Sequence, residues 1–342
     1  MNETSFIMGI VLVVLAGIFG GCWAAPIKLM RYYTFEHWLF VMALVGQLIL
    51  PWLMTFILCS DVVVSISDIP PVVLVKANLF SMAWGIANIL YGICLARIGF
   101  SLTIGIMTGI GLPMGVIVPM VLKGSGKFAD APSLLSSAGM IILFGVTIML
   151  FAVVLSAIAG YGREKSLIQQ TGRRFTLGLV MAVVIGILQI GLTFAFVYSQ
   201  GAIIEALARH GAGTAGASLG VWAFAMPGGA VTNIGFAAYL MSKKKNWRVL
   251  TANPRDLWFG LVISLGFFLV FALMGTGMRL LGPLGASVGF GIMQAFQIIS
   301  SQVLGIVLGE WRETSGKSKK LMLAAVCTML VAVVIMALGK AF

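Results

Sequence analysis

The sequence is a chain of 342 residues, of which 60% are hydrophobic and 9% are charged, with a formal net charge of +12. Soluble domains carry about 25% charged residues, so this composition excludes a water-soluble globular protein. The positive charge alone could indicate a nucleic-acid partner, but the positions of the basic residues favour another explanation. We expect a polytopic membrane protein that binds no nucleic acid.

Ten apolar stretches fill most of the chain, and each has about the ~20 residues that a helix needs to cross the hydrocarbon core. We expect membrane-spanning helices at 5–27, 37–59, 72–96, 100–122, 134–158, 175–199, 215–240, 257–280, 284–308 and 321–339. The first stretch has no basic residue before it and is too long for the apolar core of a signal peptide, so it should be retained. The predicted fold class is an all-α integral membrane protein with ten transmembrane helices.

The basic residues divide unequally between the two sides of the predicted helices. Sixteen of the 22 Lys and Arg residues lie in loops after odd-numbered spans: Lys28, Arg31, Arg97, Arg163, Lys165, Arg173, Arg174, Lys243, Lys244, Lys245, Arg248, Arg255, Arg312, Lys317, Lys319 and Lys320. Because basic residues concentrate in cytoplasmic loops, we expect both termini to lie outside. An RNA contact for Lys243–Lys245 is conceivable, but a loop exposed to water or lipid headgroups explains the run more simply.

A polar, charged connection at Gly160–Arg174 divides the chain near its middle. This predicts a first five-helix repeat at 1–160, a cytoplasmic linker at 161–174 and a second five-helix repeat at 175–342. Five is odd, so the second set enters the membrane from the opposite side, and related halves form an inverted repeat with a site near the midplane. Spans four and nine both open with GxxxG spacing, although 42 glycines make such spacing frequent by chance.

The third predicted span carries Trp84, Asn88 and Tyr91 at i, i+4 and i+7, which places all three on one helical face. An amide beside two aromatic rings suits a sugar, because hydroxyls need hydrogen-bond partners and the C–H faces of the ring stack on aromatic rings. The alternative is that Asn88 bonds a neighbouring helix and serves packing alone.

Further neutral polar groups occur in spans six, seven and nine. Gln294, Gln297 and Ser301 share one face of span nine, and two glutamines in lipid need partners that a polar cavity would supply. The other candidates for substrate contact are Gln189, Thr193, Trp222 and Asn233. Taken singly, each of these four is more typical of a structural residue than of a ligand contact.

Prolines and glycines mark possible hinges in two spans. Pro113 and Pro119 in span four, and Pro227 with Gly228 and Gly229 in span seven, should interrupt regular helix bonding. Such breaks are tolerated where the backbone faces a cavity. They can equally be passive kinks.

The acidic residues are absent from the central part of every predicted span. The chain also lacks an HExxH motif, a Ser/His/Asp set and paired acids within the spans. We therefore predict no catalytic residues, no metal site and no cofactor, and expect that the protein is not an enzyme.

The motifs taken together resemble the bacterial L-rhamnose–proton symporter family of the drug/metabolite transporter superfamily. The resemblance covers nearly the whole chain and rests on Cys22, Ala25, Pro26, Lys28, Glu36, Trp84–Gly92, Arg97, Gly99, Ser101, Gly105, Glu205, Gly228–Ala230, Asn233–Phe236, Glu310 and Trp311. It implies proton-coupled import of L-rhamnose or a related deoxysugar by alternating access, across the cytoplasmic (inner) membrane of a bacterium. It also implies that Trp84, Asn88 and Tyr91 contact the sugar.

The expected partners are the sugar, protons or another cation as coupling ion, and the lipid bilayer. A proton symporter needs a titrating group within reach of its cavity, and Glu205 and Glu310 are the candidates near helix ends. The rival functions are a drug/metabolite exporter of the same superfamily and a membrane enzyme or structural subunit. An exporter of cations is expected to have a carboxylate within its spans, and a structural subunit is expected to have large surfaces outside the membrane. The sequence shows neither feature.

Overall fold

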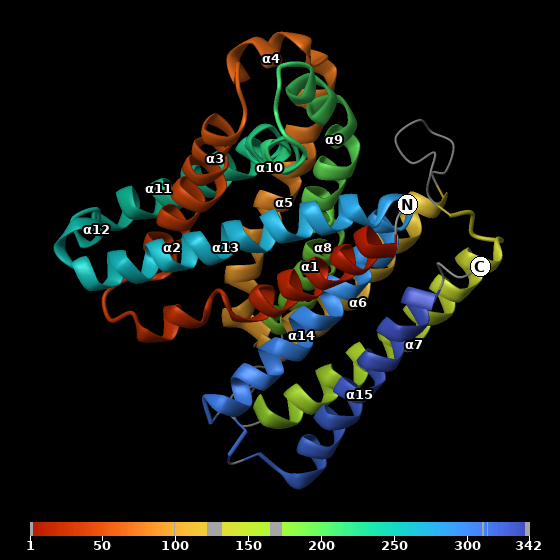
Figure 1. The fold of residues 1–342 in the computed structure, drawn as a ribbon. Coiled ribbons are helices and arrows are strands. Elements are labelled where there is room, and N and C mark those ends of the chain that lie inside the picture. The colour runs from red at the N-terminus through yellow and green to blue at the C-terminus, as the bar shows by residue number, and fades with distance from the viewer. Residues whose placement is uncertain are drawn as a thin grey trace. The chain divides into compact units, whose positions relative to one another are not determined.

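The computed structural model describes residues 3–98, 100–121, 132–164, 173–309, 311–312 and 314–338, and in these residues the regular structure is entirely helical (Figure 1). The main helices are α1 (Glu3–Cys22), α2 (Phe35–Val41), the π-helix η2 (Met42–Ile49), α3 (Leu50–Leu58), α4 (Val62–Asp68), α5 (Pro71–Ile98), α6 (Phe100–Val121), α7 (Ser137–Glu164), α8 (Arg173–Leu188), α9 (Gly191–Arg209), α10 (Thr214–Ala225), α11 (Pro227–Lys244), α12 (Val249–Ala252), α13 (Pro254–Leu280), η4 (Gly285–Gly289), α14 (Phe290–Val307) and α15 (Gly316–Leu338). The shorter 3-10 helices are η1 (Ala25–Leu29) and η3 (Gly282–Leu284).

Eight helical segments of the described residues are long and apolar enough to cross a membrane: Glu3–Leu29, Phe35–Leu58, Pro71–Cys94, Ser137–Gly162, Thr176–Arg209, Pro254–Leu280, Phe290–Val307 and Gly316–Leu338. Thr103–Val118 and Thr214–Ala225 are shorter apolar helices. Each of the ten predicted ranges overlaps helical structure, so the all-helical membrane fold is confirmed. The number of ten spans stays a prediction.

Three predicted spans are composite. The second consists of α2, η2 and α3 in succession, and the sixth consists of α8 and α9, which are separated at Gln189–Ile190. The seventh breaks at Met226, where Pro227 begins α11 without a backbone N–H to continue the preceding turn. Near the break in span six, Gly191 lies so close to the carbonyl of Phe80 that no side chain fits between them.

The prolines of the fourth predicted span lie within one continuous helix. Helix α6 runs from Phe100 to Val121 and remains helical past both Pro113 and Pro119. Each proline removes one hydrogen bond from the ladder, and the flanking turns hold the helix on course. Helix α6 is thus continuous, whereas the helix is interrupted at Met226 before Pro227, and the hinge role of these residues stays a prediction.

The chain forms two compact units, and each combines segments from before and after the predicted linker 161–174. Unit 1 contains 1–22, 90–190 and 277–342, and unit 2 contains 23–89 and 191–276. In unit 1, α7 packs along α15, α1 along α14, and α6 contacts α7, α8 and α14. In unit 2, α10 packs on α3 and α9, and α11 packs on α2 and η2.

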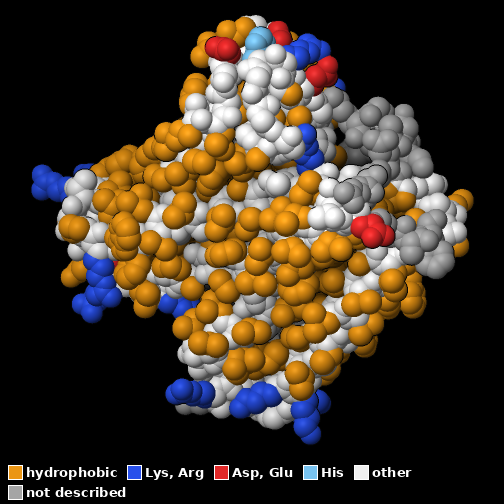
Figure 2. Space-filling model, viewed as in Figure 1, with side chains coloured by type: hydrophobic (Ala, Val, Ile, Leu, Met, Phe, Trp, Pro, Cys, Tyr) orange, Lys and Arg blue, Asp and Glu red, His pale blue; other side chains and the backbone are white. Residues whose placement is uncertain are grey.

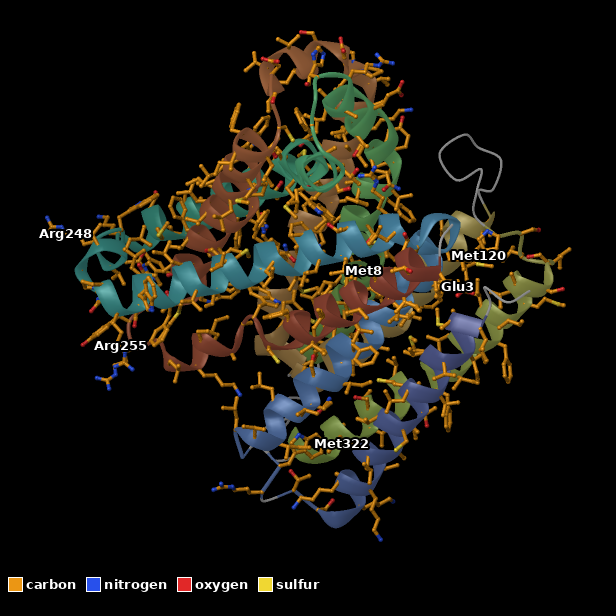
Figure 3. All side chains as sticks on the ribbon, viewed as in Figure 1. Glu3, Met8, Met120, Arg248, Arg255 and Met322 are labelled. Carbon is orange, nitrogen blue, oxygen red and sulfur yellow. The ribbon has the colours of Figure 1, made fainter. Side chains whose placement is uncertain are left out.

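The surfaces of both units fit a lipid environment. Figure 2 shows hydrophobic side chains spread over the helices, and the exposed large hydrophobic residues include Ile7, Phe144, Val262 and Leu323. Basic side chains gather instead near helix ends, and in unit 2 Arg248 and Arg255 mark the loop region between α11 and α13 (Figure 3). This distribution is the one expected for a protein that spans a membrane.

Candidate functional site

An aromatic cluster occupies the interior of unit 2. The ring of Trp84 on α5 lies 5.9 Å from Phe267 and 6.0 Å from Phe271, both on α13. Phe271 in turn lies 5.3 Å from Trp222 on α10, and Trp222 stacks on Phe196 of α9 at 4.5 Å. Trp84 is 8% exposed and Trp222 is fully buried. The predicted residues Trp84 and Trp222, which lie 138 positions apart in the sequence, thus belong to one cluster.

The break between α10 and α11 fixes α5 beside this cluster. Asn78 Oδ1 accepts a hydrogen bond from Gly228 N at 2.7 Å, and Asn78 Nδ2 donates to the carbonyl of Phe224 at 2.9 Å. Ser81 Oγ likewise accepts from Gly229 N at 2.9 Å and donates to the carbonyl of Met226 at 3.2 Å. Asn78 and Ser81 thus supply acceptors to Gly228 N and Gly229 N, two of the first N–H groups of α11, and Ser81 shares the carbonyl of Met226 with Ala230 N.

Gly85 brings α5 and α11 together one turn further along. A Cβ at Gly85 would lie 2.9 Å from both the carbonyl of Gly229 and the Cβ of Thr232. Glycine permits this approach because it has no side chain. Asn88 lies three residues beyond Gly85 and Asn233 one residue beyond Thr232, so the two amides occupy similar levels of neighbouring helices.

Four buried polar atoms of unit 2 have no hydrogen-bond partner among the described residues. Asn246 Oδ1 lies in the loop after α11, and the other three are Asn88 Nδ2, Trp222 Nε1 and Asn233 Oδ1. The other end of the Asn233 amide donates from Nδ2 to Gln47 Oε1 at 3.2 Å. A buried polar atom without a partner costs about 1–3 kcal/mol, so such atoms call for an explanation. Two donors and one acceptor beside aromatic rings are the groups that a sugar requires.

The other predicted contact residues divide between the units. Thr193 on α9 is buried in unit 2. Tyr91 is half-buried and belongs to unit 1. It lies on the same face of α5 as Trp84 and Asn88. Gln294 and Gln297 lie half-buried on α14 in unit 1. The structure brings together Trp84, Trp222 and their neighbours in unit 2.

Gln189 and Ser301 in unit 1 are engaged by backbone groups. Gln189 Nε2 donates to the carbonyl of Met107 on α6 at 2.9 Å, and its amide covers Gly111. Ser301 Oγ donates to the carbonyl of Ile298 one turn earlier at 2.7 Å. In this conformation both side chains donate their hydrogen bonds to backbone carbonyls, so these donors are not available to a ligand.

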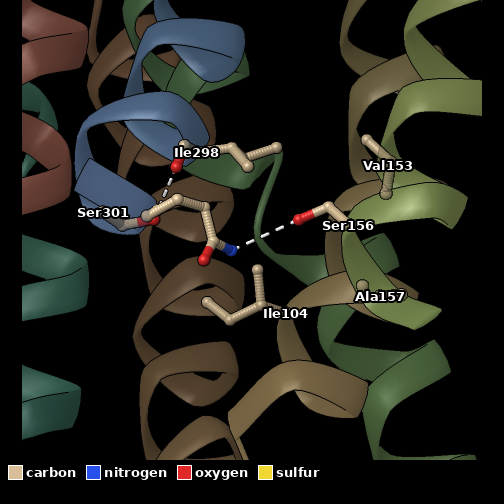
Figure 4. A pocket seen from close by; sticks show the side chains of 8 residues that line it. Ile104, Val153, Ser156, Ala157, Ile298 and Ser301 are labelled. Carbon is tan, nitrogen blue, oxygen red and sulfur yellow. Dashed lines mark hydrogen bonds between the residues drawn. The ribbon is translucent and has the colours of Figure 1, made fainter. Parts of the chain in front are cut away.

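Ser301 lines a small pocket in unit 1 between α6, α7 and α14 (Figure 4). Next to it, Gln302 Nε2 donates to Ser156 Oγ at 3.3 Å. The pocket volume of about 20 Å³ has room for about one water molecule, whereas ligand sites usually measure roughly 300 Å³ or more. This pocket therefore cannot hold a sugar in the conformation described.

The predicted proton-coupling residues are not buried where the structure describes them. Glu205 is 65% exposed and pairs with Arg209 one helical turn away at 2.6 Å. Glu310 lies outside the described residues. Across the described ranges, the buried carboxylates are those of Glu36 and Asp256, each 1% exposed. Sequence reasoning missed both because they fall at helix ends beside loops.

Asp256 anchors the loop that precedes α2. Its carboxylate accepts backbone hydrogen bonds from Arg31 at 3.1 Å, Tyr32 at 2.7 Å and Tyr33 at 3.0 Å. The hydroxyl of Tyr33 donates to the carbonyl of Leu250 at 2.7 Å. Burial, together with the nearby Asp256 carboxylate, raises the pKa of Tyr33 to about 12.

Glu36 lies in the first turn of α2. Its Oε1 accepts hydrogen bonds from Lys244 Nζ and Asn246 Nδ2, each at 2.9 Å. The ammonium of Lys244 and the amide of Asn246 favour the ionised carboxylate. Two buried acids therefore join the segment 31–37 to the segment 244–256 within unit 2.

Comparison with known proteins shows similarity along the entire chain. The family model of the L-rhamnose-proton symport protein (RhaT) matches residues 1–342. The L-rhamnose-proton symporter of Cronobacter sakazakii is 29% identical over 343 residues, which cover 98% of each chain. The L-rhamnose-proton symporter of Yersinia pestis is 26% identical over 349 residues, and the alignment covers 100% of both chains.

Proposed function

Because the chain belongs to the L-rhamnose-proton symport protein family, we propose that it imports L-rhamnose, or a related deoxysugar, together with protons by alternating access. The family is one of transporters, so the prediction that the protein is not an enzyme is confirmed. The observation that supports sugar transport is the set of unpaired buried atoms Asn88 Nδ2, Trp222 Nε1 and Asn233 Oδ1 beside the aromatic cluster.

The sugar contacts that we propose lie in unit 2. Asn88 Nδ2 and Trp222 Nε1 donate to sugar hydroxyl oxygens, and Asn233 Oδ1 accepts from a hydroxyl. Trp84 and Phe271 contact the C–H faces and the methyl group, which water solvates poorly. Trp222 and Phe196 are buried and stack on each other at 4.5 Å, so we propose that substrate enters when the helices around the cluster separate.

The remaining predicted sugar contacts stay part of the proposal, and they differ in burial and in the hydrogen bonds that they make now. Gln294, Gln297 and Tyr91 are half-buried, and no side-chain hydrogen bond engages the two glutamines in the described structure. Thr193 is buried near the start of α9. Gln189 and Ser301 would have to leave the backbone carbonyls that they bond now before they could contact a sugar.

We also propose that ten membrane helices form two inverted five-helix repeats, 1–160 and 175–342, with 161–174 as the linker. The contacts within unit 1 support this pairing. In an inverted repeat, span one (α1) corresponds to span six (which begins with α8), span four (α6) to span nine (α14), and span five (α7) to span ten (α15). The contact between α1 and α14 then corresponds to the contact between α8 and α6. The contact between α6 and α7 corresponds to the contact between α14 and α15. The contacts α6–α14 and α7–α15 each join a helix to its own counterpart.

Glycines lie at two of the helix contacts that correspond between the proposed repeats. A Cβ at Gly17 of α1 would lie 2.5 Å from the carbonyl of Met293 on α14, and a Cβ at Gly186 of α8 would lie 3.0 Å from the carbonyl of Met107 on α6. Both helix pairs thus approach through a glycine against a methionine carbonyl. The same residue types at matching contacts are what two related halves would retain.

The location that we propose is the cytoplasmic (inner) membrane of a bacterium, with both termini outside. The excess of basic residues in loops after odd-numbered spans supports this orientation. We place the chain in the drug/metabolite transporter superfamily on the resemblance of its motifs. Export, the other activity of that superfamily, is not favoured, since the relatives compared are named symporters.

Uptake of labelled L-rhamnose tests the proposed function. Cells that express the chain should accumulate the sugar above its external concentration, and a protonophore should abolish the accumulation. Equal expression of an unrelated carrier provides the control. A well-expressed, membrane-inserted protein that accumulates no L-rhamnose and no competing deoxysugar would refute the proposal.

A further inference from the structure

The two buried carboxylates of unit 2 differ in what binds them. Asp256 is held by three backbone N–H groups, which cannot leave without unfolding the loop before α2. Glu36 is held by two side chains, Lys244 and Asn246, and the Lys244 side chain is 50% exposed to solvent. Only the partners of Glu36 can withdraw by rotation of side chains.

Both ring nitrogens of the neighbouring His37 have hydrogen-bond partners. Its Nδ1 lies 3.2 Å from Thr34 N, which can only donate, so Nδ1 must be the acceptor. The proton is therefore on Nε2, which donates to the carbonyl of Asn246 at 3.2 Å. These two contacts of His37 are thus to backbone groups, whereas Glu36 contacts the half-exposed side chain of Lys244.

The Glu36–Lys244 ion pair and the Asn233–Gln47 hydrogen bond join the same two helical segments. Glu36 and Gln47 lie eleven residues apart on α2–η2, and Lys244 and Asn233 lie eleven residues apart on α11. Eleven residues of α-helix span about 16 Å. The two segments therefore run antiparallel, with the proposed sugar contact Asn233 inside the membrane and the ion pair at the proposed cytoplasmic end.

The buried carboxylate of Glu36 has a cation, the Lys244 ammonium, as its charged partner. Removal of Lys244 would leave the Glu36 charge buried and uncompensated, which is strongly unfavourable. The other titratable groups nearby do not replace it. The ring nitrogens of His37 contact Thr34 N and the carbonyl of Asn246, Tyr33 is a phenol whose pKa is raised to about 12, and Asp256 is another carboxylate. When α2 and α11 separate at this end, Glu36 must take up a proton or reach water.

We propose that the Glu36–Lys244 ion pair is the cytoplasmic gate of the transporter, and that a proton replaces Lys244 on Glu36 when the gate opens. The inference rests on the proposed function. The carboxylate binds the transported proton as the ammonium withdraws into water, the helices part, and the sugar leaves Asn233. The proton then passes to cytoplasmic water, and the carboxylate pairs with Lys244 again.

Transport by Glu36→Gln in proteoliposomes provides the first test. Glutamine keeps the shape of the side chain and cannot carry a proton. We expect the variant to lose accumulation driven by a proton gradient and to retain exchange of labelled for unlabelled L-rhamnose. The control Asp61→Asn neutralises an exposed carboxylate and should keep both activities. Normal accumulation by Glu36→Gln, or loss of exchange as well in a folded variant, would overturn the inference.

A second measurement does not depend on the substrate. Met241 is fully buried on α11, three residues before Lys244, so a cysteine there should react with an impermeant maleimide only when the gate opens. We expect Met241→Cys to react faster as the pH falls, and at a high, pH-independent rate when combined with Glu36→Gln. The parent chain gives the background of the native cysteines. Labelling that responds neither to pH nor to Glu36→Gln would overturn the gate even if L-rhamnose proves to be the wrong substrate.

Discussion

Asn233 donates a hydrogen bond from Nδ2 to Gln47 Oε1 at 3.2 Å, and this contact aims the free Asn233 Oδ1 away from Gln47. Both residues are about 1% exposed or less. One half of the amide thus fixes its orientation, and the other half stays available for a ligand hydroxyl. This division between a held and a free end is the arrangement that a preorganised binding site requires.

Replacement of Asn233 should therefore weaken sugar binding. Asn233→Leu removes the acceptor for the sugar and the donor to Gln47, and we expect the affinity for L-rhamnose to fall by roughly 10- to 100-fold, equivalent to about 1–3 kcal/mol. The measurement is the KM of uptake. Ser199→Ala, which removes a buried hydroxyl bonded only within α9, is the matched control and should keep the wild-type KM. An unchanged KM in Asn233→Leu would exclude this residue from the site.

The indole nitrogen of Trp222 offers a test of a single donor. Trp222→Phe keeps an aromatic ring on Phe196 and deletes Nε1, which has no partner in the described structure. We expect the affinity for L-rhamnose to fall about tenfold, since a buried sugar hydroxyl would lose its donor. Phe196→Leu serves as the comparison, because it disturbs packing around Trp222 without removing a polar group. Equal losses in both variants would assign the effect to packing.

Asn78 should contribute to stability through the helix break. Asn78→Ala leaves Gly228 N and the carbonyl of Phe224 without the partners that they have now. We expect a loss of about 1–3 kcal/mol, visible as a lower Tm of the purified protein in detergent. Thr328→Ala, which removes an exposed hydroxyl from α15, is the control and should leave Tm unchanged. A wild-type Tm for Asn78→Ala would show that the break does not need this side chain.

The raised pKa of Tyr33 should make the stability of the protein depend on pH in the alkaline range. Its pKa is raised to about 12 by burial and by Asp256, whereas an unfolded tyrosine titrates near 10. The folded state therefore holds the phenolic proton more tightly, and this contribution is complete below pH ~10 and is lost as the pH rises towards ~12. Tm should fall over this range in the wild type and fall less steeply in Tyr33→Phe. Parallel curves for the two proteins would contradict the assignment.

The sequence was sufficient to predict helices because long apolar runs have few alternatives in a membrane. The face that joins Trp84 and Asn88 also follows from their spacing along one helix. In contrast, the ring neighbours of Trp222 come from two other helices, α9 and α13, and no local pattern identifies them. The interruption at Gln189–Ile190 was missed because neither residue is a proline or glycine.

The buried acids illustrate the same limit at the ends of the helices. Glu36 and Asp256 lie beside polar loops, where exposure is the usual expectation. Their burial results from packing between segments about 200 residues apart, which supplies Lys244 to Glu36 and three backbone donors to Asp256. Asn78 and Ser81 were overlooked for a similar reason, since their partners exist only because Pro227 breaks a distant helix.

Binding of L-rhamnose to purified Asn88→Ala tests the sugar site in unit 2 most directly. Asn88 Nδ2 is buried without a partner, so its removal should cost little stability and much affinity. We expect the wild type to bind the sugar with a change in tryptophan fluorescence, and Asn88→Ala to keep the wild-type Tm while its Kd rises at least about tenfold. A wild-type Kd in a correctly folded Asn88→Ala would contradict the proposed site.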